Sequence, residues 1–579
     1  MRDVNEPLGF SEGFGASTIV PDDGNVLPRL ETAALCDALR RLPADELHLA
    51  FSRKLVPMVT LPGLNLYAAC GLPALEHANA QGLKIIAYAE SGELIAAARA
   101  VHGPKLLQEA ASGLSRRSPE FSARWRLSEG QAWIGLLLLA LIAASAALLP
   151  LIVVWIMASV VSGAFFLSVI SLRILCLFPP LKVKRQRPAR LSDADLPVYS
   201  VLVPLFRETS VLRQLLGALN SLDYPVEKLD IKLILEETDI LMQRALAGIR
   251  LPRQFETIIV PAGTPQTKPR ALNYALQFAR GSLLTIYDAE DIPEPDQLLK
   301  AAERFASASP DLACLQAQLT FYNASENWLT RQFSIEYAVL FGVLLPVLAN
   351  HRLPLPLGGT SNHFRMAALK QVGAWDPHNV TEDADLGLRL ARFGFDAETL
   401  DSRTYEEATT QTMNWLRQRA RWMKGFLLTW LVHMRDPKRF AGEVGPAGFW
   451  TAQAMTLGVF ASALLHPFCL AASVWLYLAG PMVPEGAGIT PLLLAGVNLL
   501  VFVAGYGVTL VIAARALSRR GIGGWYLPLA TMPFYWLMMS IAAWYGLWQF
   551  VTAPFYWNKT EHGLSSFQRQ KRKRERRGE

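Results

Sequence analysis

The stretch Leu283-Leu284-Thr285-Ile286-Tyr287-Asp288-Ala289-Glu290-Asp291 decides the fold. Its first five residues are apolar, β-branched or aromatic, which predicts a short buried strand, and three carboxylates follow at once. Two similar runs, residues 201–203 and 231–235, lie upstream, and helical stretches separate all three. This alternation predicts an α/β domain between about residues 198 and 431, in which helices cover a mostly parallel sheet.

The carboxylates after this strand are candidate metal ligands. Asp288 and Glu290 follow the carboxyl end of the predicted strand, where open α/β sheets bind their ligands. Side chains two positions apart at such a strand end can converge on Mg²⁺ or Mn²⁺, and this ion can bridge phosphate oxygens. Asp291 is available as a third ligand or as a support for the other two. An ordinary acidic loop before Pro293 is the alternative that these residues alone leave open.

Two more motifs follow along the chain. Thr381-Glu382-Asp383 places two acids behind a threonine, which also suits the N-cap of a helix. Gln418-Arg419-Ala420-Arg421-Trp422 has the form Q-x-x-R-W, and its first, fourth and fifth residues share one face of a helix. An amphipathic helix lying on a membrane is the alternative, because the same segment carries these aromatic and basic residues: Trp415, Arg417, Arg419, Trp422 and Lys424.

Composition indicates a membrane protein. The 579 residues are 51% hydrophobic and 18% charged, and the uncharged residues gather in long blocks. The net charge of +7 is concentrated in residues 182–187 and 569–577, which flank apolar blocks. This placement predicts cytoplasmic flanks and contact with anionic lipid headgroups rather than nucleic-acid binding. The five cysteines have no paired spacing, which predicts reduced thiols and soluble parts in the cytoplasm.

The acidic cluster, Thr381-Glu382-Asp383, Q-x-x-R-W and a long apolar block stand in that order. Together they resemble the processive family 2 glycosyltransferases, which are membrane synthases that extend a polysaccharide from nucleotide sugars. The resemblance covers roughly residues 130–565. It extends to bacterial cellulose synthase-like proteins and to the branch related to phage adsorption protein B. It implies an α/β GT-A type nucleotide-sugar-binding domain inserted between transmembrane helices, with a small N-terminal α/β domain before them.

The resemblance also implies residue roles. Asp383 would be the catalytic base that accepts the proton of the acceptor hydroxyl, with Glu382 and Thr381 beside it. Trp422 would stack on the acceptor sugar, and Asn362 and His363 would contact sugar hydroxyls. The glycines before Asn362 suit a backbone that approaches a sugar closely, although a plain turn explains them equally well.

The predicted nucleotide-sugar site combines residues from several motifs. The family usually holds uracil and ribose with paired aspartates, but this chain has Glu236-Glu237-Thr238-Asp239, so Glu236 and Asp239 are both candidates. The full predicted set is Pro204, Glu208, Glu236, Asp239, Lys268, Asp288, Gln418 and Arg421. Lys268 begins a segment before the metal site, where a cation can reach phosphate, although an ordinary exposed helix start is the alternative.

The predicted domains are residues 1–26 (flexible lead), 27–127 (small cytoplasmic α/β domain), 131–178 (transmembrane hairpin divided at Pro150), 196–435 (cytoplasmic glycosyltransferase domain with interfacial helices), 444–557 (transmembrane block) and 558–579 (cytoplasmic K-T-x-H-G loop and basic tail). Residues 327–348 are a further predicted interfacial helix. We expect the block at 521–558 to leave the cytoplasm and return, as two crossings or as a re-entrant hairpin broken near Pro533. Six crossings and two cytoplasmic termini then follow.

The N-terminal domain resembles that of type II secretion ATPases. A structural or docking module is one role for it, and a receptor for cyclic di-GMP is the other, while a periplasmic partner stays open. The sequence as a whole predicts a processive, inverting, metal-dependent synthase in the bacterial inner membrane. It would join a UDP-linked sugar into a β-linked polysaccharide and export the chain through its helices. The alternatives are a non-processive transferase acting on a lipid or short acceptor, and a receptor or assembly protein with an inactive transferase domain.

Overall fold

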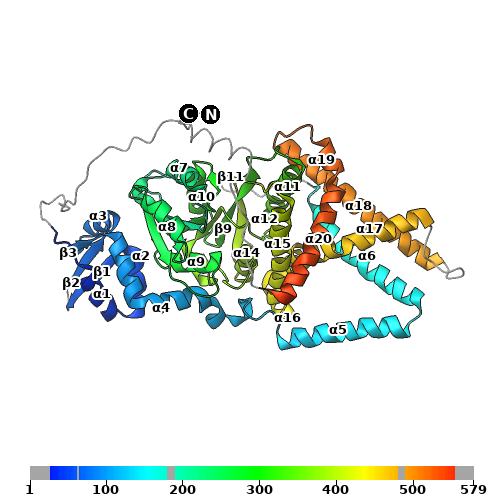
Figure 1. Ribbon diagram of the computed structural model, residues 1–579, viewed down its shortest axis with the longest axis horizontal. Coiled ribbons are helices and arrows are strands. Elements are labelled where there is room, and N and C mark those ends of the chain that lie inside the picture. Colours follow the sequence, from blue (N-terminus) through cyan, green and yellow to red (C-terminus); the bar gives the residue numbers. More distant parts are fainter. Residues whose placement is uncertain (1–26, 62–63, 179–189, 480–488, 555–579) are drawn as a thin grey trace. The chain divides into compact units, whose positions relative to one another are not determined.

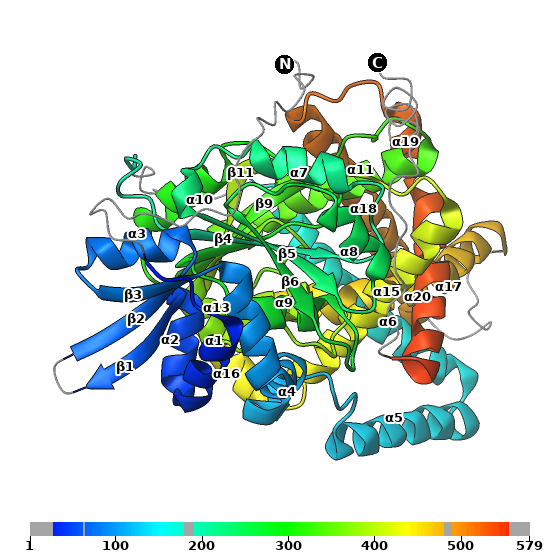
Figure 2. The same cartoon turned by 60° about the vertical axis from the view of Figure 1, so that its left-hand side comes forward.

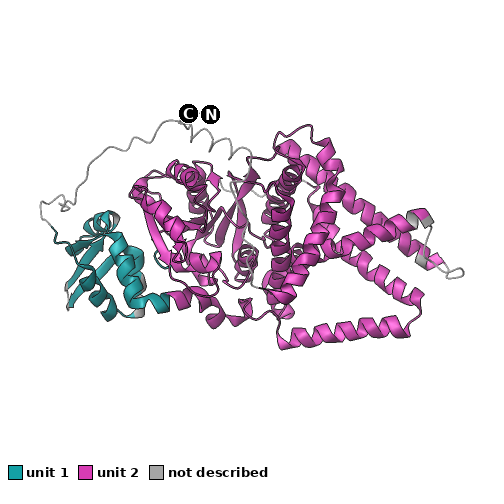
Figure 3. Cartoon of the chain, in the orientation of Figure 1, with its two compact units in different colours: residues 1–106, 277–279 teal, residues 107–276, 280–579 magenta. Residues whose placement is uncertain are grey.

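The computed structural model describes residues 27–61, 64–178, 190–479 and 489–554 (Figure 1). The predicted lead at 1–26, the basic run at 182–187 and the loop and tail at 558–579 lie outside the described residues. The chain forms two compact units, one of residues 1–106 with 277–279 and one of residues 107–276 with 280–579 (Figure 3).

Unit 1 is a small α/β fold, as the sequence predicts. Its sheet has the order β1-β2-β3, with β1 antiparallel and β3 parallel to β2. The elements are α1 (Thr32–Arg41), α2 (Ala44–Arg53), β1 (Leu55–Leu61), β2 (Leu64–Cys70), α3 (Leu72–Ala80), β3 (Lys84–Ala89) and the first part of α4 (Ser91–Arg117).

The boundary of unit 1 differs from the predicted domain at 27–127. Helix α4 crosses the boundary, and its second half belongs to unit 2. Residues 118–126 are bound to unit 2, because Arg435 donates hydrogen bonds to the carbonyl oxygens of Pro119, Glu120, Ser122 and Trp125. Unit 1 thus ends at Leu106, whereas the predicted domain ends at residue 127.

Unit 2 contains an eight-stranded sheet of order β6-β5-β4-β7-β10-β9-β11-β8. The strands are β4 (Tyr199–Leu205), β5 (Leu229–Glu236), β6 (Phe255–Val260), β7 (Leu283–Ile286), β8 (Ile292–Pro293), β9 (Leu312–Phe321), β10 (Asn362–Arg365) and β11 (Asp396–Glu406). Strands β4 to β7 are mutually parallel, whereas β10 runs antiparallel to its neighbours β7 and β9. All eight residues of β5 are buried, which explains its apolar sequence.

Helices lie against both faces of this sheet (Figure 2). They are α7 (Leu212–Asn220), α8 (Ile240–Ala247), α9 (Lys268–Leu276), α10 (Gln297–Ala306), α13 (Met366–Gln371) and α14 (Glu382–Arg392). The carboxyl ends of β4, β5 and β7 meet at one edge because these strands are parallel neighbours. This edge is where the sequence predicts ligands to bind.

Five helical segments of the described chain are long and apolar enough to cross a membrane: Glu129–Leu148 (α5), Leu151–Leu175 (α6), Trp328–Asn350 (α11 and α12), Pro437–Trp475 (within α16 and α17) and Leu492–Arg519 (within α18). Two of them form the predicted pair around Pro150, which is the N-cap residue of α6. The third is the predicted interfacial segment, and 67% of its most apolar window is buried in the protein. α11 (Trp328–Val339) and α12 (Leu345–Asn350) are joined there by a π-helical turn.

The last apolar block is described up to residue 554. It holds α19 (Tyr526–Ala530), which is too short to span a bilayer, and a single long helix, α20 (Met532–Thr552). The chain does turn near Pro533, as predicted, but α20 then runs beside α15 (Thr412–His433), as Figures 1 and 2 show. A methyl group at Gly546 of α20 would lie 2.7 Å from the backbone oxygen of Ala420, which shows how closely the two helices approach.

Candidate active site

A cavity of 360 Å³ lies at the carboxyl edge of the parallel strands. It draws together segments that are far apart in the sequence, from the end of β4 to the middle of α15. Twelve of the predicted site residues line it: Pro204, Glu208, Glu236, Lys268, Asp288, Glu290, Thr381, Glu382, Asp383, Gln418, Arg421 and Trp422. Four do not: Asp239, Asp291, Asn362 and His363.

The acidic cluster follows β7 directly. Asp288 and Glu290 line the cavity, and Lys268 at the start of α9 lies with its Nζ 2.5 Å from Asp288 Oδ1. Lys268 also donates to the backbone oxygen of Gly359 at 2.7 Å. Asp291 lies behind these groups: its carboxylate accepts hydrogen bonds from the backbone N–H of Asp288, at 2.7 Å, and from the Thr360 hydroxyl. Asp291 thus orients Asp288, which is one of the two roles expected for it, and its role as a direct metal ligand stays a prediction.

The cavity has the charge that a divalent cation requires. Its lining carries seven carboxylates, Glu208, Glu236, Asp288, Glu290, Glu382, Asp383 and Glu406, and two cationic side chains, Lys268 and Arg421. Burial and the charge of Asp288 raise the pKa of Glu290 well above its ordinary value. A hard cation near Asp288 and Glu290 would relieve this repulsion, and oxygen ligands are those that Mg²⁺ and Mn²⁺ prefer. Among the described residues, no three acidic, histidine or cysteine side chains already form a metal-binding cluster.

Glu382 and Asp383 lie in the first turn of α14, on the far side of the cavity from β4. Burial and the charge of Asp383 raise the pKa of Glu382 to about 8. Burial also raises the pKa of Asp383, although a hydrogen bond from the backbone N–H of Ala384, at 2.8 Å, opposes the shift. Gly359 lies against this carboxylate, since a methyl group there would come within 3.3 Å of Asp383 Oδ2. The glycine therefore allows a close approach of backbone and carboxylate.

Thr381 occupies the N-cap position of α14, but its side chain does not cap the helix. Its hydroxyl instead lies 3.2 Å from the Thr429 hydroxyl of α15 and 3.4 Å from Asn379 Oδ1. Capping by the side chain, which the sequence leaves open, is therefore not its role here. Thr381 joins the acidic turn to α15.

Helix α15 carries the Q-x-x-R-W motif into the cavity. Arg419 lies between Gln418 and Arg421 of the motif and is only 1% exposed. Its contacts anchor α15 to neighbouring helices. It donates to Glu336 Oε1 at 2.6 Å and to the Tyr535 hydroxyl at 3.1 Å, and its guanidinium lies 4.3 Å from the centre of the Trp422 ring. Trp422 also stacks beside Tyr337, with ring centres 6.4 Å apart.

This burial contradicts the alternative of a helix lying on a membrane surface. Trp415, Arg419 and Lys424 were expected to face lipid in that alternative, but the exposed fractions of their side chains are between 0% and 1%. Trp415 donates to the Tyr535 hydroxyl at 3.2 Å. Helix α15 is therefore packed between α14 and α20 within unit 2. Its buried aromatic and basic residues make contacts inside the protein.

Glu236 and Asp239 separate in the structure. Glu236 lies at the end of β5, lines the cavity and accepts from Arg270 Nη2 at 2.6 Å. Asp239 is the N-cap residue of α8, accepts from the backbone N–H of Met242 at 3.2 Å, and also accepts from the backbone N–H of Arg207. Glu236 is therefore the better candidate for contact with a nucleotide, and Asp239 shapes the loop below it.

Asn362 and His363 are core residues of β10. His363 is fully buried, with Nδ1 2.7 Å from the Tyr199 hydroxyl and Nε2 3.2 Å from Gln297 Oε1. Asn362 donates to the backbone oxygen of Gly358 at 2.6 Å. Neither residue lines the cavity, so the contact with sugar hydroxyls expected for them stays a prediction that the lining does not support. Thr360, two residues before Asn362, lines the cavity, and a linear motif does not show which of the following side chains turn away from it.

Sequence reasoning missed Glu406 and Arg270. Glu406 ends β11 and lines the cavity, where burial and the charges of Asp291, Glu290 and Asp288 raise its pKa well above its ordinary value. Its signal was an acid at the end of a strand, the same signal that identifies Asp288. Arg270 lies inside the segment that was singled out for Lys268, and only the structure shows that it pairs with Glu236.

Comparisons with known proteins agree with this site. Residues 283–558 match the family model described as "Glycosyl transferase family group 2". Glucomannan 4-beta-mannosyltransferase 2 of Arabidopsis thaliana is 28% identical over 217 residues, which cover 35% of this chain and 40% of that protein. The probable glycosyltransferase YdaM of Bacillus subtilis (strain 168) is 24% identical over 234 residues, which cover 40% of this chain and 56% of that protein. The chain thus spans about half the length of these curated relatives.

Solved structures with a similar chain course include the mannosyltransferase PcManGT from Pyrobaculum calidifontis in complex with GDP-Man and Mn²⁺. It is 18% identical and covers 68% of this chain and 98% of that chain, with a TM-score of 0.42. The family match includes the acidic cluster, Thr381-Glu382-Asp383 and the Q-x-x-R-W helix. Over residues 283–558 the chain is thus similar to family 2 glycosyltransferases, and the motifs of that similarity meet in the cavity.

Proposed function

We propose that this protein is an inverting, metal-dependent glycosyltransferase that polymerises a nucleotide-activated sugar. One observation carries the proposal: a single cavity contains the acidic pair after β7, the acids of α14 and the Q-x-x-R-W face of α15. Transfer with inversion needs a cation at the leaving diphosphate, one base for the acceptor hydroxyl and a surface for the acceptor. Each of these three requirements has its own candidate residues in the cavity.

Asp288 and Glu290 would hold Mg²⁺ or Mn²⁺ beside the donor diphosphate. Such an ion neutralises the charge that develops on the leaving group. Lys268 and Arg421 are the two cations of the lining and would contact the same phosphate oxygens, together with Gln418. Pro204, Glu208 and Glu236 line the part of the cavity next to β4 and β5 and would hold the nucleoside.

Asp383 would accept the proton of the attacking hydroxyl. Its carboxylate lies at the cavity wall against Gly359, and the backbone N–H of Ala384 fixes one of its oxygens. Glu382, with its pKa raised to about 8, holds a proton more readily than Asp383 and is therefore the weaker candidate for a base at neutral pH. Thr381 would keep this turn against α15.

Trp422 would stack on the acceptor sugar. Its ring is part of an aromatic wall with Tyr337, Phe341 and Phe426, and an apolar wall suits the C–H face of a pyranose ring. This wall belongs to α11, the π-helical turn and α15, which lie next to the apolar helices. Their proximity supports processive extension followed by export through the membrane helices, with the cavity on the cytoplasmic side of the bacterial inner membrane.

Incorporation of radiolabelled sugar tests the proposal. The purified full chain in detergent would be incubated with Mg²⁺ or Mn²⁺ and a panel of UDP-sugars, to which GDP-mannose is added because curated relatives are 4-beta-mannosyltransferases. High-mass product from one donor is the expected result. Transfer of one sugar to a lipid or short acceptor would support the non-processive alternative. Absence of both transfer and nucleotide release, with cyclic di-GMP added as well, would overturn the enzyme proposal.

A further inference from the structure

Residues 118–126, which we call the strap, join α4 to the membrane helix α5 and bind to the catalytic unit. Phe121 of the strap is 2% exposed, its ring centre lies 5.6 Å from that of Phe393, and the Arg392 guanidinium lies 4.7 Å from the same ring. Arg435, just after α15, donates to four strap carbonyl oxygens. The strap is therefore anchored by specific contacts along most of its length.

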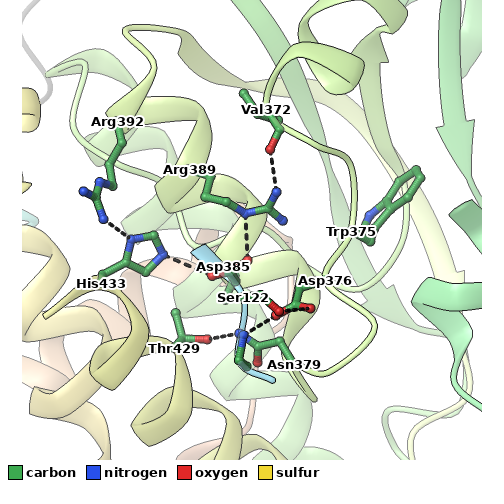
Figure 4. A network of polar contacts seen from close by, with 12 residues as sticks. Ser122, Val372, Trp375, Asp376, Asn379, Asp385, Arg389, Arg392, Thr429 and His433 are labelled. Atoms are coloured by element: carbon green, nitrogen blue, oxygen red, sulfur yellow. Dashed lines mark hydrogen bonds and ion pairs between the residues drawn. The ribbon is translucent and has the colours of Figure 1, made fainter. Parts of the chain in front are cut away.

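The strap shares one buried carboxylate with the loop that leads into the catalytic turn. Asp376 is fully buried, and its Oδ1 accepts from the Ser122 hydroxyl at 3.1 Å while its Oδ2 accepts from the backbone N–H of Ala123 (Figure 4). On the loop side, Oδ1 also accepts from the backbone N–H of His378 at 3.1 Å. These donors hold the buried carboxylate of Asp376 in place, because the loss of one donor would leave part of its negative charge uncompensated.

From Asp376 a short series of hydrogen bonds reaches the catalytic acids. The backbone N–H of Asn379 donates to the backbone oxygen of Asp376 at 3.1 Å. Asn379 Oδ1 in turn accepts from the backbone N–H of Thr381 at 3.1 Å. Asn379 also donates to the Thr429 hydroxyl of α15 at 2.9 Å, as Figure 4 shows. Two residues beyond Thr381 stands Asp383. A shift of Asp376 therefore moves the turn that presents the proposed base.

The loop is also tied to the donor side of the cavity. The Thr267 hydroxyl donates to the backbone oxygen of Pro377 at 3.1 Å, and Thr267 itself lines the cavity just before Lys268. The loop thus has supports at the cavity, at α15 and at the strap. The strap residues do not line the cavity.

We propose that Asp376 is a positioning residue for the transfer reaction, and that docking of the strap onto it sets the position of Asp383. The strap continues into the apolar helix α5, so the strap connects this helix to the turn that carries Asp383. Undocking would leave Asp376 with unmet acceptors and would loosen residues 376–383. The kinetic part of this inference rests on the proposed function, whereas the structural part does not.

Three variants of the full chain in detergent test this connection. Asp376→Asn keeps the shape of the side chain but replaces one carboxylate oxygen with an NH₂ group. This group must face the backbone N–H of Ala123 or of His378, so two donors oppose each other and one hydrogen bond is lost. Ser122→Ala removes one donor and is the milder change. Glu120→Gln is the matched control, because Glu120 belongs to the strap and its side-chain carboxylate pairs with the exposed Arg439, at 3.7 Å, while its backbone contact to Arg435 is unchanged.

Two measurements are made on each variant. Amide hydrogen exchange should show faster exchange of residues 376–383 in Asp376→Asn and, to a smaller extent, in Ser122→Ala, with β4 and β5 unchanged. Initial rates should show kcat about tenfold lower for Asp376→Asn with the donor KM within about twofold, since the donor contacts remain. Glu120→Gln should match the wild type in both.

Unchanged exchange at 376–383 in a folded Asp376→Asn protein would overturn the proposal, whatever its activity. So would faster exchange with a wild-type kcat, or a loss expressed only in KM. If Asp376→Asn does not fold, the same readings of Ser122→Ala decide. If the wild type transfers no sugar, the proposed function fails, and the exchange experiment still shows whether the strap positions the turn.

Discussion

Gly425 of α15 lies directly against Thr381, the first residue of the catalytic turn. A methyl group at position 425 would be 2.3 Å from Thr381 Cγ2 and 2.6 Å from its hydroxyl oxygen. No side chain fits there without moving one of the two helices. The contact therefore fixes the distance between the acids of α14 and the Q-x-x-R-W face of α15, to which we assign different roles in the proposed transfer.

Gly425→Ala should lower both stability and transfer. Overpacking of a close contact costs about 1–3 kcal/mol, and the displaced turn should reduce kcat. Gly442→Ala is the matched control: it adds the same methyl group to exposed α16 (Pro437–Gln453), where nothing lies within 4 Å. Because alanine favours helix, the control should keep its stability or gain up to about 1 kcal/mol. Thermal unfolding and initial rates measure both; a fully active, stable Gly425→Ala protein would contradict the contact.

The pH dependence of the rate should separate Asp383 from Glu382. A base works in its ionised form, so the raised pKa of Asp383 moves the acid limb of the profile above the ordinary range of an aspartate. Asp383→Asn should lower kcat/KM by about 10²–10⁴-fold at every pH. Glu382→Gln should keep the acid limb. If Glu382 were the base, the limb would lie near its pKa of about 8 and would vanish in Glu382→Gln.

Glu382 should also make stability depend on pH. Its pKa is about 8 in the folded protein against an ordinary 4.5, so folding favours the protonated form. Its contribution is therefore most favourable at low pH and is lost as pH rises from about 4.5 to 8. Glu382→Gln, which stays neutral, should raise the melting temperature relative to wild type at high pH more than at low pH. An equal difference in melting temperature at low and at high pH would show that folding does not raise the pKa of Glu382.

The sequence predicted the parallel strands and most of the charged residues that line the cavity for a physical reason. Acids that follow buried strands, such as Asp288 after β7, must emerge at the carboxyl edge of a parallel sheet. The same reasoning would have found Glu406 after β11. The same reasoning does not reveal that His363 is buried. His363 lies on the four-residue strand β10 between β7 and β9, where a side chain is buried on either face, and motif spacing does not encode this position in the sheet.

Helix α15 shows a second limit. Aromatic and basic residues at helical spacing are compatible with a membrane surface or with internal ion pairs. Glu336, which lies 83 residues before Arg419 in the chain, decides between them. The pairing depends on how α11, α15 and α20 pack, and a local pattern does not encode that packing. The sequence likewise left residues 521–558 open between two crossings and a re-entrant hairpin, and only the structure shows one long helix, α20, packed beside α15.

Metal binding should depend on Asp288 and much less on distant acids. Asp288→Asn should weaken Mn²⁺ binding by at least about tenfold, as removing one charged oxygen ligand does. Asp296→Asn is the control, because Asp296 precedes α10 and pairs only with the surface Lys300, at 2.9 Å. Calorimetric titration with Mn²⁺ measures this without any substrate. Chelation should stop transfer in the wild type, and added Mg²⁺ or Mn²⁺ should restore it; equal Mn²⁺ affinity in both variants would rule out Asp288 as a ligand.

Arg419 should control chain extension through Trp422. The guanidinium holds Glu336 and the Tyr535 hydroxyl by its fork of donors, and its flat face lies 4.3 Å from the centre of the Trp422 ring. Lysine at this position keeps the charge but provides neither the fork nor the flat face. Arg419→Lys should therefore destabilise the protein by about 1–3 kcal/mol and let the indole ring tilt.

The tilt should affect the acceptor more than the donor. We expect Arg419→Lys to lower the rate of polymer formation while hydrolysis of the donor sugar nucleotide, which needs only water as acceptor, changes little. Arg417→Lys is the control, since Arg417 lies on the same helix and is exposed. Product length on gels and nucleotide release give the two rates. Equal loss of both would mean that Arg419 serves the whole cavity rather than the indole, because an undirected packing defect has no reason to spare hydrolysis.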